Sequence, residues 1–395
     1  MAATKPAADR KVARAVQRVT STALGPYQSA VVRIGFAATW LLFLLCEVPN
    51  RHALYGPDGP WSWDMGRELV ADNNAFTVLL VSGSTLWFEV VYGVCLLSSL
   101  LMLLGWHTRA VSAVFMVGVL SLQNRSIFVG DGGDNVVHLM AVYLVLTRCA
   151  QVWSLDARRA ARNPGPDRVG PVLWSVLGVL LFVGTLLGRA GGDTWLIVLF
   201  WVLWTAQGVW WAANRYAPES EPRTLLDVLA NLAHNAALFV IMAEVCLIYA
   251  TAGWYKIQGS RWQDGTALYY PLKLDYFAPW PELSALLASG GVMVMLLTYG
   301  TVAVQVAFPF TLLRRRVKNV LLAVMMLEHA AIAVLLGLPF FSLAMIAADA
   351  VFLPTAFLVN LGALVVRRRN RLLAGRAVPP QLRRGSEERH RTLVG

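Results

Sequence analysis

Eight ionisable side chains lie inside stretches of sequence that are otherwise apolar, and their chemistry needs an explanation. A charged group inside an apolar helix costs several kcal/mol unless it is paired or hydrated, so residues of this kind mark functional sites by default. They include acids, bases and imidazoles, which together predict a polar site within a membrane. The eight are Arg33, Glu89, His138, His234, Glu244, Glu328, His329 and Asp349.

Five of these residues are expected at a similar depth. At 1.5 Å of rise per residue, Glu244 lies about 12 Å from the C-terminal end of its apolar segment. Glu328 and His329 precede a Gly-Leu-Pro turn by a similar distance, and Asp349 is comparably deep in the last segment. His138 follows a polar, glycine-rich loop by one turn. A polar cavity open to one face of the membrane would explain this distribution.

Lys256 is expected to begin the loop that follows the segment of Glu244. A low-dielectric wall of Trp254, Tyr255 and Trp262 would favour the neutral amine, which is the form of lysine that can act as a base. The alternative is a lysine that extends to the lipid headgroups.

Each candidate also has a purely structural interpretation. His138 could hydrogen-bond between helices, and the pair Glu328–His329 could lock two helices together. A metal bound by the His and Glu residues is a further alternative, but no single helix carries them at ligand spacing. We therefore predict no metal site.

The composition explains which elements carry these residues. The chain has 395 residues, of which 57% are hydrophobic and only 14% charged, and its mean hydropathy is +0.55. A soluble domain would carry about a quarter charged residues. The net charge of +11 does not indicate nucleic-acid binding, because the basic residues fall in the tails and in alternate loops.

Ten apolar segments predict an all-α polytopic membrane protein of about ten transmembrane helices. Of the 34 Lys and Arg residues, 26 fall in the two tails and the even-numbered loops, when Arg148 near the end of the fourth segment is counted with the loop that follows it. Seven fall in the odd-numbered loops, and Arg33 lies within the first segment. This bias places both termini in the cytoplasm. The segments are about 29–47, 76–104, 110–123, 136–153, 171–188, 194–213, 225–252, 283–313, 319–336 and 340–366.

Three regions follow from this organisation. Residues 1–28 form a basic cytoplasmic segment, in which 9–20 could be an amphipathic helix on the anionic leaflet. Residues 29–366 form the transmembrane domain, with an inserted helical hairpin at about 157–229. Residues 367–395 form a basic cytoplasmic tail.

Three groups of residues follow one another in order along the chain. The first group is Leu104-Gly105-Trp106-His107-Thr108-Arg109 with Asn124-Arg125, Asp134-Asn135, His138 and Trp153-Ser154-Leu155-Asp156. The second is Ala252-Gly253-Trp254-Tyr255-Lys256-Ile257 with Trp262-Gln263-Asp264-Gly265-Thr266-Ala267-Leu268-Tyr269-Tyr270, and the third is Glu328-His329 with Gly337 and Phe341-Ser342. Together they resemble a known superfamily, the vitamin K-dependent gamma-carboxylases and their bacterial relatives, the horizontally transferred transmembrane (HTTM) domain proteins. The resemblance covers about 29–156 and 230–356.

The resemblance implies a mechanism. Lys256 matches the lysine that acts as a base in the carboxylases. It would accept a proton from a vitamin K hydroquinone or from reduced menaquinone, with His138 and His329 in support. The quinone would bind within the membrane, in the cavity lined by Glu244, Glu328 and Asp349 together with the aromatic wall. An HTTM protein is expected in the bacterial plasma membrane.

Three departures from the carboxylases keep the activity open. Val137 stands where they have an asparagine, the hairpin at about 157–229 is absent from their pattern, and no counterpart of their large soluble domain is expected here. The chain is also similar to the sporulation-delaying protein B group, which implies maturation or export of a secreted peptide or protein beside a single-pass membrane partner with an outward domain. Three functions are therefore weighed: this maturation role, a quinol-dependent oxidoreductase with Lys256 as base, and a non-catalytic protein that binds lipid or partners.

Overall fold

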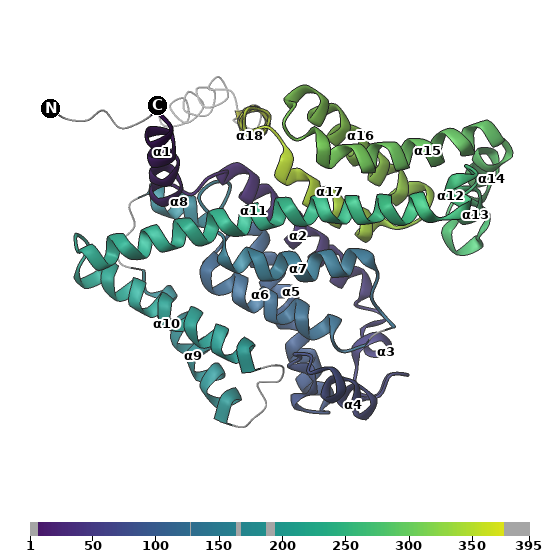
Figure 1. Cartoon of the computed structure of the whole chain (residues 1–395). Helices are drawn as coiled ribbons and strands as arrows, with labels where there is room; N and C mark the ends of the chain where they lie inside the picture. The colour runs from purple at the N-terminus through teal and green to yellow at the C-terminus, as the bar shows by residue number, and fades with distance from the viewer. Residues whose placement is uncertain (1–6, 127, 163–166, 187–193, 375–395) are drawn as a thin grey trace, which may run out of the picture. The chain divides into compact units, whose positions relative to one another are not determined.

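The computed structural model describes residues 7–126, 128–162, 167–186 and 194–374, and every regular element within these ranges is helical (Figure 1). Seven of these helices are long and apolar enough to cross a membrane, or eight if α17 and α18 form one broken span. The part of the chain described is therefore an all-α, multi-pass membrane protein. The seven are α2 (Pro26–Glu47), α5 (Thr85–Leu104), α9 (Val169–Leu186), α10 (Thr194–Tyr216), α11 (Glu221–Gln258), α15 (Gly291–Ala307, continued by η3, Phe308–Thr311) and α16 (Arg315–Leu335).

Two shorter apolar helices correspond to the third and fourth predicted segments. They are α6 (Thr108–Gln123) and α7 (Gly132–Leu146), with 16 and 15 residues. At 1.5 Å per residue they span about 24 and 22 Å, less than the roughly 30 Å of a hydrocarbon core. The count of ten crossings therefore stays a prediction, while the membrane-spanning character of the chain is confirmed by the longer helices.

Glycine and proline divide three of the predicted segments. Because glycine weakens a helix and proline excludes the residue before it from helical geometry, these breaks have local causes. The second segment starts as a 3-10 turn and becomes helical only after Ser82-Gly83-Ser84; the eighth breaks at Gly290; the last breaks at Leu353-Pro354. The resulting pieces are η1 (Leu79–Val81) before α5, α14 (Pro281–Ser289) before α15, and α17 (Pro339–Asp349) with η4 (Ala350–Phe352) before α18 (Thr355–Ala374).

The remaining short elements lie at the ends of the long helices. The amphipathic helix expected at 9–20 is confirmed as α1, Ala7–Ser21. The others are α3 (Arg51–Tyr55), α4 (Trp63–Asn73), α8 (Leu155–Ala161), α12 (Ser260–Gln263), α13 (Tyr269–Lys273) and η2 (Asp275–Phe277).

The core is built around α2, which packs against α5, α7 and α17. Phe36, Trp40 and Leu44 on α2 are buried, at 2% exposure or less. Gly35 permits the close approach of α17, since a Cβ atom there would lie 2.6 Å from the side chain of Ala347. Small residues at such contacts let helix backbones meet closely in membrane proteins.

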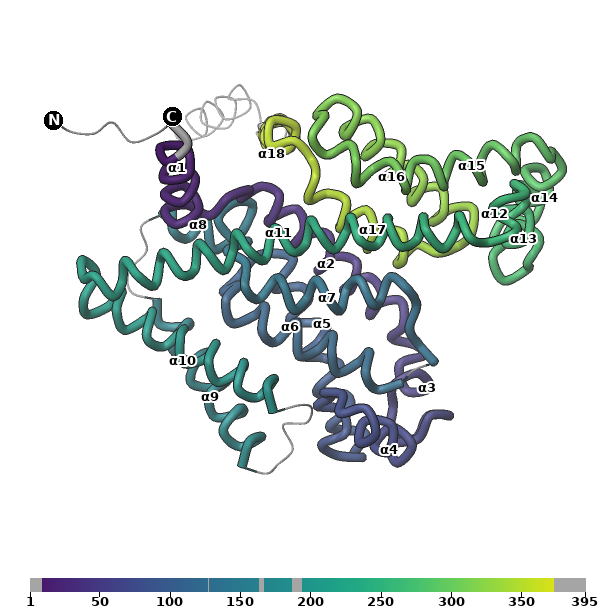
Figure 2. Tube along the Cα trace, viewed as in Figure 1, coloured from purple at the N-terminus to yellow at the C-terminus, as the bar shows by residue number. Residues whose placement is uncertain are grey.

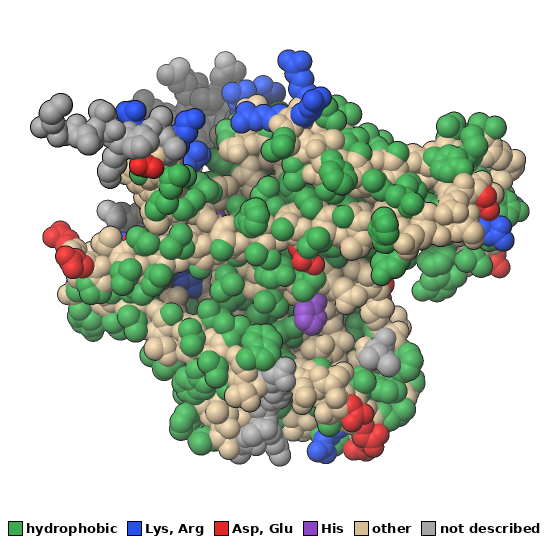
Figure 3. All heavy atoms as spheres, viewed as in Figure 1, with side chains coloured by type: hydrophobic (Ala, Val, Ile, Leu, Met, Phe, Trp, Pro, Cys, Tyr) green, Lys and Arg blue, Asp and Glu red, His purple; other side chains and the backbone are tan. Residues whose placement is uncertain are grey.

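Helix α11 is the longest element and links the core to the site described below. Its 38 residues extend about 57 Å at 1.5 Å per residue, more than a bilayer core requires. Figure 2 follows α11 from the turn after α10 to the short helices α12, α13 and α14. Hydrophobic and uncharged side chains cover most of its visible length (Figure 3).

Helices α9 and α10 form the hairpin that the sequence predicts as an insertion. Trp174 and Trp204 stack at 4.2 Å between ring centroids, and the indole N–H of each donates to the backbone carbonyl of the other. Few other side chains of the hairpin are buried. The hairpin also contacts α6 and α11, and much of its remaining surface is apolar and exposed.

The chain divides into two compact units, Met1–Phe352 and Leu353–Gly395. Within the second unit the structure describes α18, whose last turns are rich in arginine. The domain limits predicted from the sequence, 1–28, 29–366 and 367–395, concern membrane topology and stay predictions; residues 1–6 and 375–395 lie outside the described ranges.

Candidate functional site

A chain of polar side chains joins the C-terminal part of α11 to α15 and α16. Lys256 Nζ donates to Oε1 of Gln305 on α15. Nε2 of Gln305 donates to Oε1 of Glu328 on α16 over 2.7 Å. The two partners orient the amide, with its oxygen toward the amine and its nitrogen toward the carboxylate.

The position of Lys256 corrects one expectation from the sequence. Helix α11 continues to Gln258, so Lys256 lies in its last turn rather than in the following loop. The helix continues because residues 252–258 include only one glycine and no proline. Lys256 therefore has the fixed backbone of a helical residue.

A second cluster, Tyr249–His329–Asp349, lies next to this chain. The Tyr249 hydroxyl is 3.0 Å from both carboxylate oxygens of Asp349 and 3.1 Å from Nε2 of His329. All three side chains are buried, and Asp349 is fully so. When Tyr249 donates to Asp349, its oxygen can accept a hydrogen bond from His329 only if Nε2 carries the hydrogen, and Nδ1 of the neutral imidazole then has the lone pair. Nδ1 is buried and has no hydrogen-bond partner among the described residues.

One face of α11 carries both groups. Tyr249 and Lys256 are seven residues apart, so they lie within about 20° of each other around the helix. Gly253, between them, lets α15 approach, because a Cβ atom there would be 2.6 Å from the side chain of Val306. The Ala-Gly-Trp-Tyr-Lys segment thus combines a close helix contact with the site lysine.

The three predicted aromatic residues take different directions. The Trp262 ring lies under Lys256, with Nζ 5.2 Å from the ring centroid, a distance suited to a cation–π contact. Trp254 and Tyr255 are exposed by 61% and 74% and face outward from the chain. Of the predicted wall, Trp262 is therefore the member that contacts the lysine.

His138 belongs to a different network, between α6 and α7. Its Nδ1 is 3.0 Å from Oε1 of Gln123, whose Nε2 donates to the backbone carbonyl of Asp134 over 2.7 Å. Gly133, near the start of α7, instead contacts Phe341 of α17. His138 follows Gly133 by five residues and therefore points about 140° away from it around α7. The structure thus brings His138 together with Gln123 and not with Lys256.

Glu244 also faces away from the lysine. It lies near Tyr143 of α7, with which it interacts electrostatically. Twelve residues separate it from Lys256, which corresponds to about 120° around α11. The predicted cavity residues therefore divide, with Glu328 and Asp349 beside Lys256 and His329, and Glu244 on the α7 side.

Arg33 has a structural environment. It is fully buried, and its guanidinium donates to backbone carbonyls over 2.5 to 3.2 Å. Because the last carbonyls of a helix have no partner within it, Arg33 caps the end of α5 and holds the turn after α7. The four acceptors are Met102, Leu103, Cys149 and Trp153.

The other two ionisable residues have similar roles. His234 accepts from the backbone N–H of Arg148 over 2.8 Å and reaches the carbonyl of Leu24 at 2.7 Å. Glu89, at the start of α5, pairs with Arg51 at 2.8 Å. These contacts satisfy the polar atoms without any bound ligand.

The first group of resemblance residues forms a joint between α5, α6 and α8. The Asp156 carboxylate accepts from the backbone N–H groups of His107 and Thr108 at 2.9 Å each, which caps α6. Asp156 N–H donates back to Gly105. His107 contacts Arg159 at 2.7 Å, and burial followed by the charge of Arg159 lowers the His107 pKa. These residues position helices.

Two residues at the centre of the site, Gln305 and Tyr249, were not predicted. Neither is ionised near neutral pH, so neither was counted among the residues that are costly in a membrane. A signal existed for Gln305, since an amide inside an apolar segment also needs hydrogen-bond partners. Tyr249 could have been found from its position two turns before Lys256.

No group of three or more His, Cys, Asp or Glu side chains is arranged to hold a metal ion in the ranges described above. Comparison of the chain with models of protein families, with curated proteins and with solved structures gave no match. The fold and the site together define a multi-pass α-helical membrane protein with a buried, hydrogen-bonded set of ionisable groups.

Proposed function

We propose that Lys256 acts as a base toward an acidic group carried by a lipid-soluble molecule, of which a quinol is the best candidate. The observation that supports this function is the chain from Lys256 through Gln305 to Glu328. It gives one amine a fixed position in the last turn of a long apolar helix. It also places a carboxylate where it can stabilise the charge that the amine gains.

The chemistry assigned to these residues is a proton transfer. A neutral Lys256 can donate one N–H to Gln305 and still present its lone pair to a substrate hydroxyl. When the O–H bond breaks, the proton moves to Nζ and the lysine becomes an ammonium. The Glu328 carboxylate then favours the ammonium through Gln305, since opposite charges attract strongly in a low-dielectric site.

The residues fit a quinol by their chemistry. The Trp262 ring beside Lys256 offers an aromatic surface to a flat ring, and the unpaired Nδ1 of His329 is a second polar group that needs a partner. A bound menaquinol or vitamin K hydroquinone would supply two acidic hydroxyls and reducing equivalents. Lys256 would bind one hydroxyl and hold its proton, and His329 would orient the polar side of the site.

A second candidate is a role in the maturation or export of a secreted peptide or protein beside a single-pass membrane partner. The α9–α10 hairpin favours it, because few of its side chains are buried and it presents an apolar surface that includes Leu180, Leu186 and Val198. Cross-linking from position 180 should then capture one membrane partner, whereas a surface that meets only lipid would give none. Location in the bacterial plasma membrane, ten crossings and cytoplasmic termini are part of the same proposal.

Quinone recovery tests the first candidate. Protein purified from bacterial membranes in mild detergent is extracted, and its quinones are measured by mass spectrometry. We expect menaquinone at a constant ratio to the protein, strongly reduced by Trp262→Leu. Trp254→Leu is the matched control, because it makes the same change at a tryptophan that faces outward. Absence of quinone from the unaltered protein, or equal loss in both variants, would reject the quinol.

A further inference from the structure

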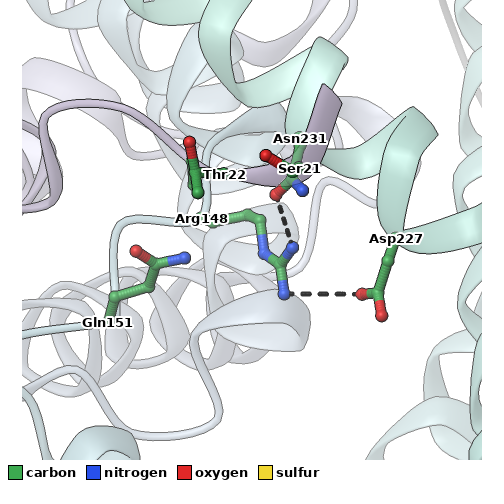
Figure 4. Close-up of a pocket in the computed structure, with 7 residues that line it drawn as sticks. Ser21, Thr22, Arg148, Gln151, Asp227 and Asn231 are labelled. Carbon is green, nitrogen blue, oxygen red and sulfur yellow. Dashed lines mark hydrogen bonds and ion pairs between the residues drawn. The ribbon is translucent and has the colours of Figure 1, made fainter. Parts of the chain in front are cut away.

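A second polar site lies apart from Lys256, where α1, the turn after α7 and the first turns of α11 meet. It is a cavity of about 430 Å³. Such a volume is within the range of small-molecule sites, which is roughly 300 to 1,000 Å³. Figure 4 shows Arg148 at its centre, between Gln151 on one side and Asp227 on the other. The lining residues are Ser21, Thr22, Ala23, Arg148, Gln151, Asp227 and Asn231.

Hydrogen bonds from α11 fix the walls of this cavity. Asn231 Nδ2 donates to the carbonyl of Thr20 over 2.9 Å, and Asn235 exchanges three hydrogen bonds with the segment 19–24 at 2.8 to 2.9 Å. His234 joins the same segment to the backbone of Arg148. The end of α1 is therefore held in place by an asparagine–histidine–asparagine face of α11, and the cavity is preformed.

The guanidinium of Arg148 is positioned by the same face. Nη1 donates to Oδ1 of Asn231 over 2.7 Å, and Nη2 is 3.7 Å from Asp227. A guanidinium has five N–H donors in a planar fork, so these two contacts leave donors that can face the cavity. Gln151 lies on the opposite side of the cavity and adds an amide that can donate as well.

Positive charge exceeds negative charge around the cavity. Arg109 and Arg148 both lie over the ring of Trp210, with Cζ at 4.3 and 5.6 Å from its centroid. Asp227 pairs with Arg223 at 3.3 Å, closer than with Arg148. Two arginines thus pair with one carboxylate, a third arginine lies near them on Trp210, and the closer partner of the carboxylate lies outside the cavity lining. An anion is the ligand that this charge distribution favours.

The neighbouring helix indicates where the anion would come from. Helix α1 carries basic residues, while Val12 and Val16 are exposed by 63% and 54%. A helix of this kind lies in the interface of an anionic membrane. It ends at Ser21, on the cavity itself. The cavity is therefore expected at the depth of the lipid headgroups, where phosphate is the abundant anion and where basic pockets between helices bind it.

We propose that this cavity binds a phosphate group, with Arg148 as its main ligand and the headgroup of an anionic phospholipid as its source. The fork of Arg148 matches two phosphate oxygens. Gln151 and the hydroxyl groups at the end of α1 complete the polar lining. A free phosphate or soluble phosphate ester offers the same chemistry and is distinguished by the test.

Lipid binding to purified protein tests the site. Phosphatidylglycerol is titrated in mild detergent, and bound lipid is counted by native mass spectrometry. Arg148→Gln removes the charge but keeps the backbone N–H bonded to His234, so we expect about a tenfold or greater loss of affinity. Arg158→Gln on α8 is the matched control, because Arg158 is exposed and lies outside the cavity, and it should bind as the unaltered protein does.

Asp227→Asn tests the same idea in the opposite direction. Removing the only carboxylate of the lining should tighten binding several-fold, a gain that a damaged fold cannot produce. Inorganic phosphate is titrated in parallel by thermal melting. Protection by phosphate with no phosphatidylglycerol binding assigns the site to a soluble phosphate compound and overturns the lipid source. Equal lipid binding by the Arg148→Gln and unaltered proteins, or no response to either probe, overturns the phosphate site.

Discussion

At the scale of single residues, the site depends on groups that share their protons. Tyr249 is the only described link between His329 and Asp349, since its hydroxyl contacts both. Gln305 is the equivalent link between Lys256 and Glu328. An uncharged residue thus decides how each pair of ionisable groups is coupled.

Removing the Tyr249 hydroxyl should therefore be costly. Tyr249→Phe leaves a buried carboxyl and a buried imidazole without their partner, and we expect a loss of about 1–3 kcal/mol of folding free energy. Thermal melting in detergent measures it. Tyr299→Phe is the control, because that hydroxyl donates to a carbonyl from a side chain that is 44% exposed. If both variants melted at similar temperatures, the hydroxyl of Tyr249 would contribute no more to folding stability than an exposed hydroxyl does.

The sequence predicts the charged members of the site better than their arrangement. Lys256, Glu328, His329 and Asp349 stand out because ionisable groups are costly in apolar helices. Which of them meet depends on the angle around each helix, and the sequence predicts a similar depth for His138 and Glu244 without giving that angle. The directions of Trp254 and Tyr255 depended on where α11 ends, which was expected a few residues too early.

At the scale of elements, buried polar residues act as helix caps and joints. Arg33 satisfies four carbonyls from two segments. Arg33→Met keeps most of the side-chain volume but removes the guanidinium donors from these buried carbonyls, so we expect a loss of about 3 kcal/mol or more of folding free energy, measured by chemical or thermal denaturation in detergent. Arg158→Met on the surface should change stability little. A stable Arg33→Met protein would show that water replaces the guanidinium.

The joint at His107 predicts a dependence on pH. Its pKa is lowered in the folded protein, first by burial and then by Arg159, so the folded state binds a proton less readily than the unfolded state. The contribution of neutral His107 to folding stability is complete above its pKa in the unfolded chain, about 6.5. It is lost as pH falls below that value, because the unfolded state then binds more protons than the folded state. Melting temperatures between pH 7 and 5 should fall less steeply for His107→Gln. If melting temperature depended on pH equally in the variant and the unaltered protein, His107 would not be a source of the pH dependence.

At the scale of the whole molecule, hydropathy and charge predict a multi-pass membrane protein, and the long apolar helices confirm it. Hydropathy alone does not reveal the breaks at Gly290 and Pro354, although the glycine and the proline that cause them are visible in the sequence. It also cannot decide whether helices as short as α6 and α7 cross.

Topology follows from the alternation of basic residues and is tested at one position. We expect Arg158→Cys, in a protein with its four native cysteines replaced, to resist a membrane-impermeant maleimide in intact cells and to react after the membrane is opened. Residue 158 is exposed, so access depends on the side of the membrane. Strong labelling in intact cells would end the ten-helix topology with cytoplasmic termini.

The proposed proton transfer depends on Lys256 being able to lose its proton, and Lys256→Arg tests this most directly. Arginine keeps the positive charge but stays protonated in proteins. We predict that a strain carrying Lys256→Arg makes and inserts the protein normally yet shows the full defect of a strain without the gene. Lys273→Arg, the same change at a lysine outside the site, should behave as the unaltered strain does. Unaltered behaviour of the Lys256→Arg strain would contradict the base.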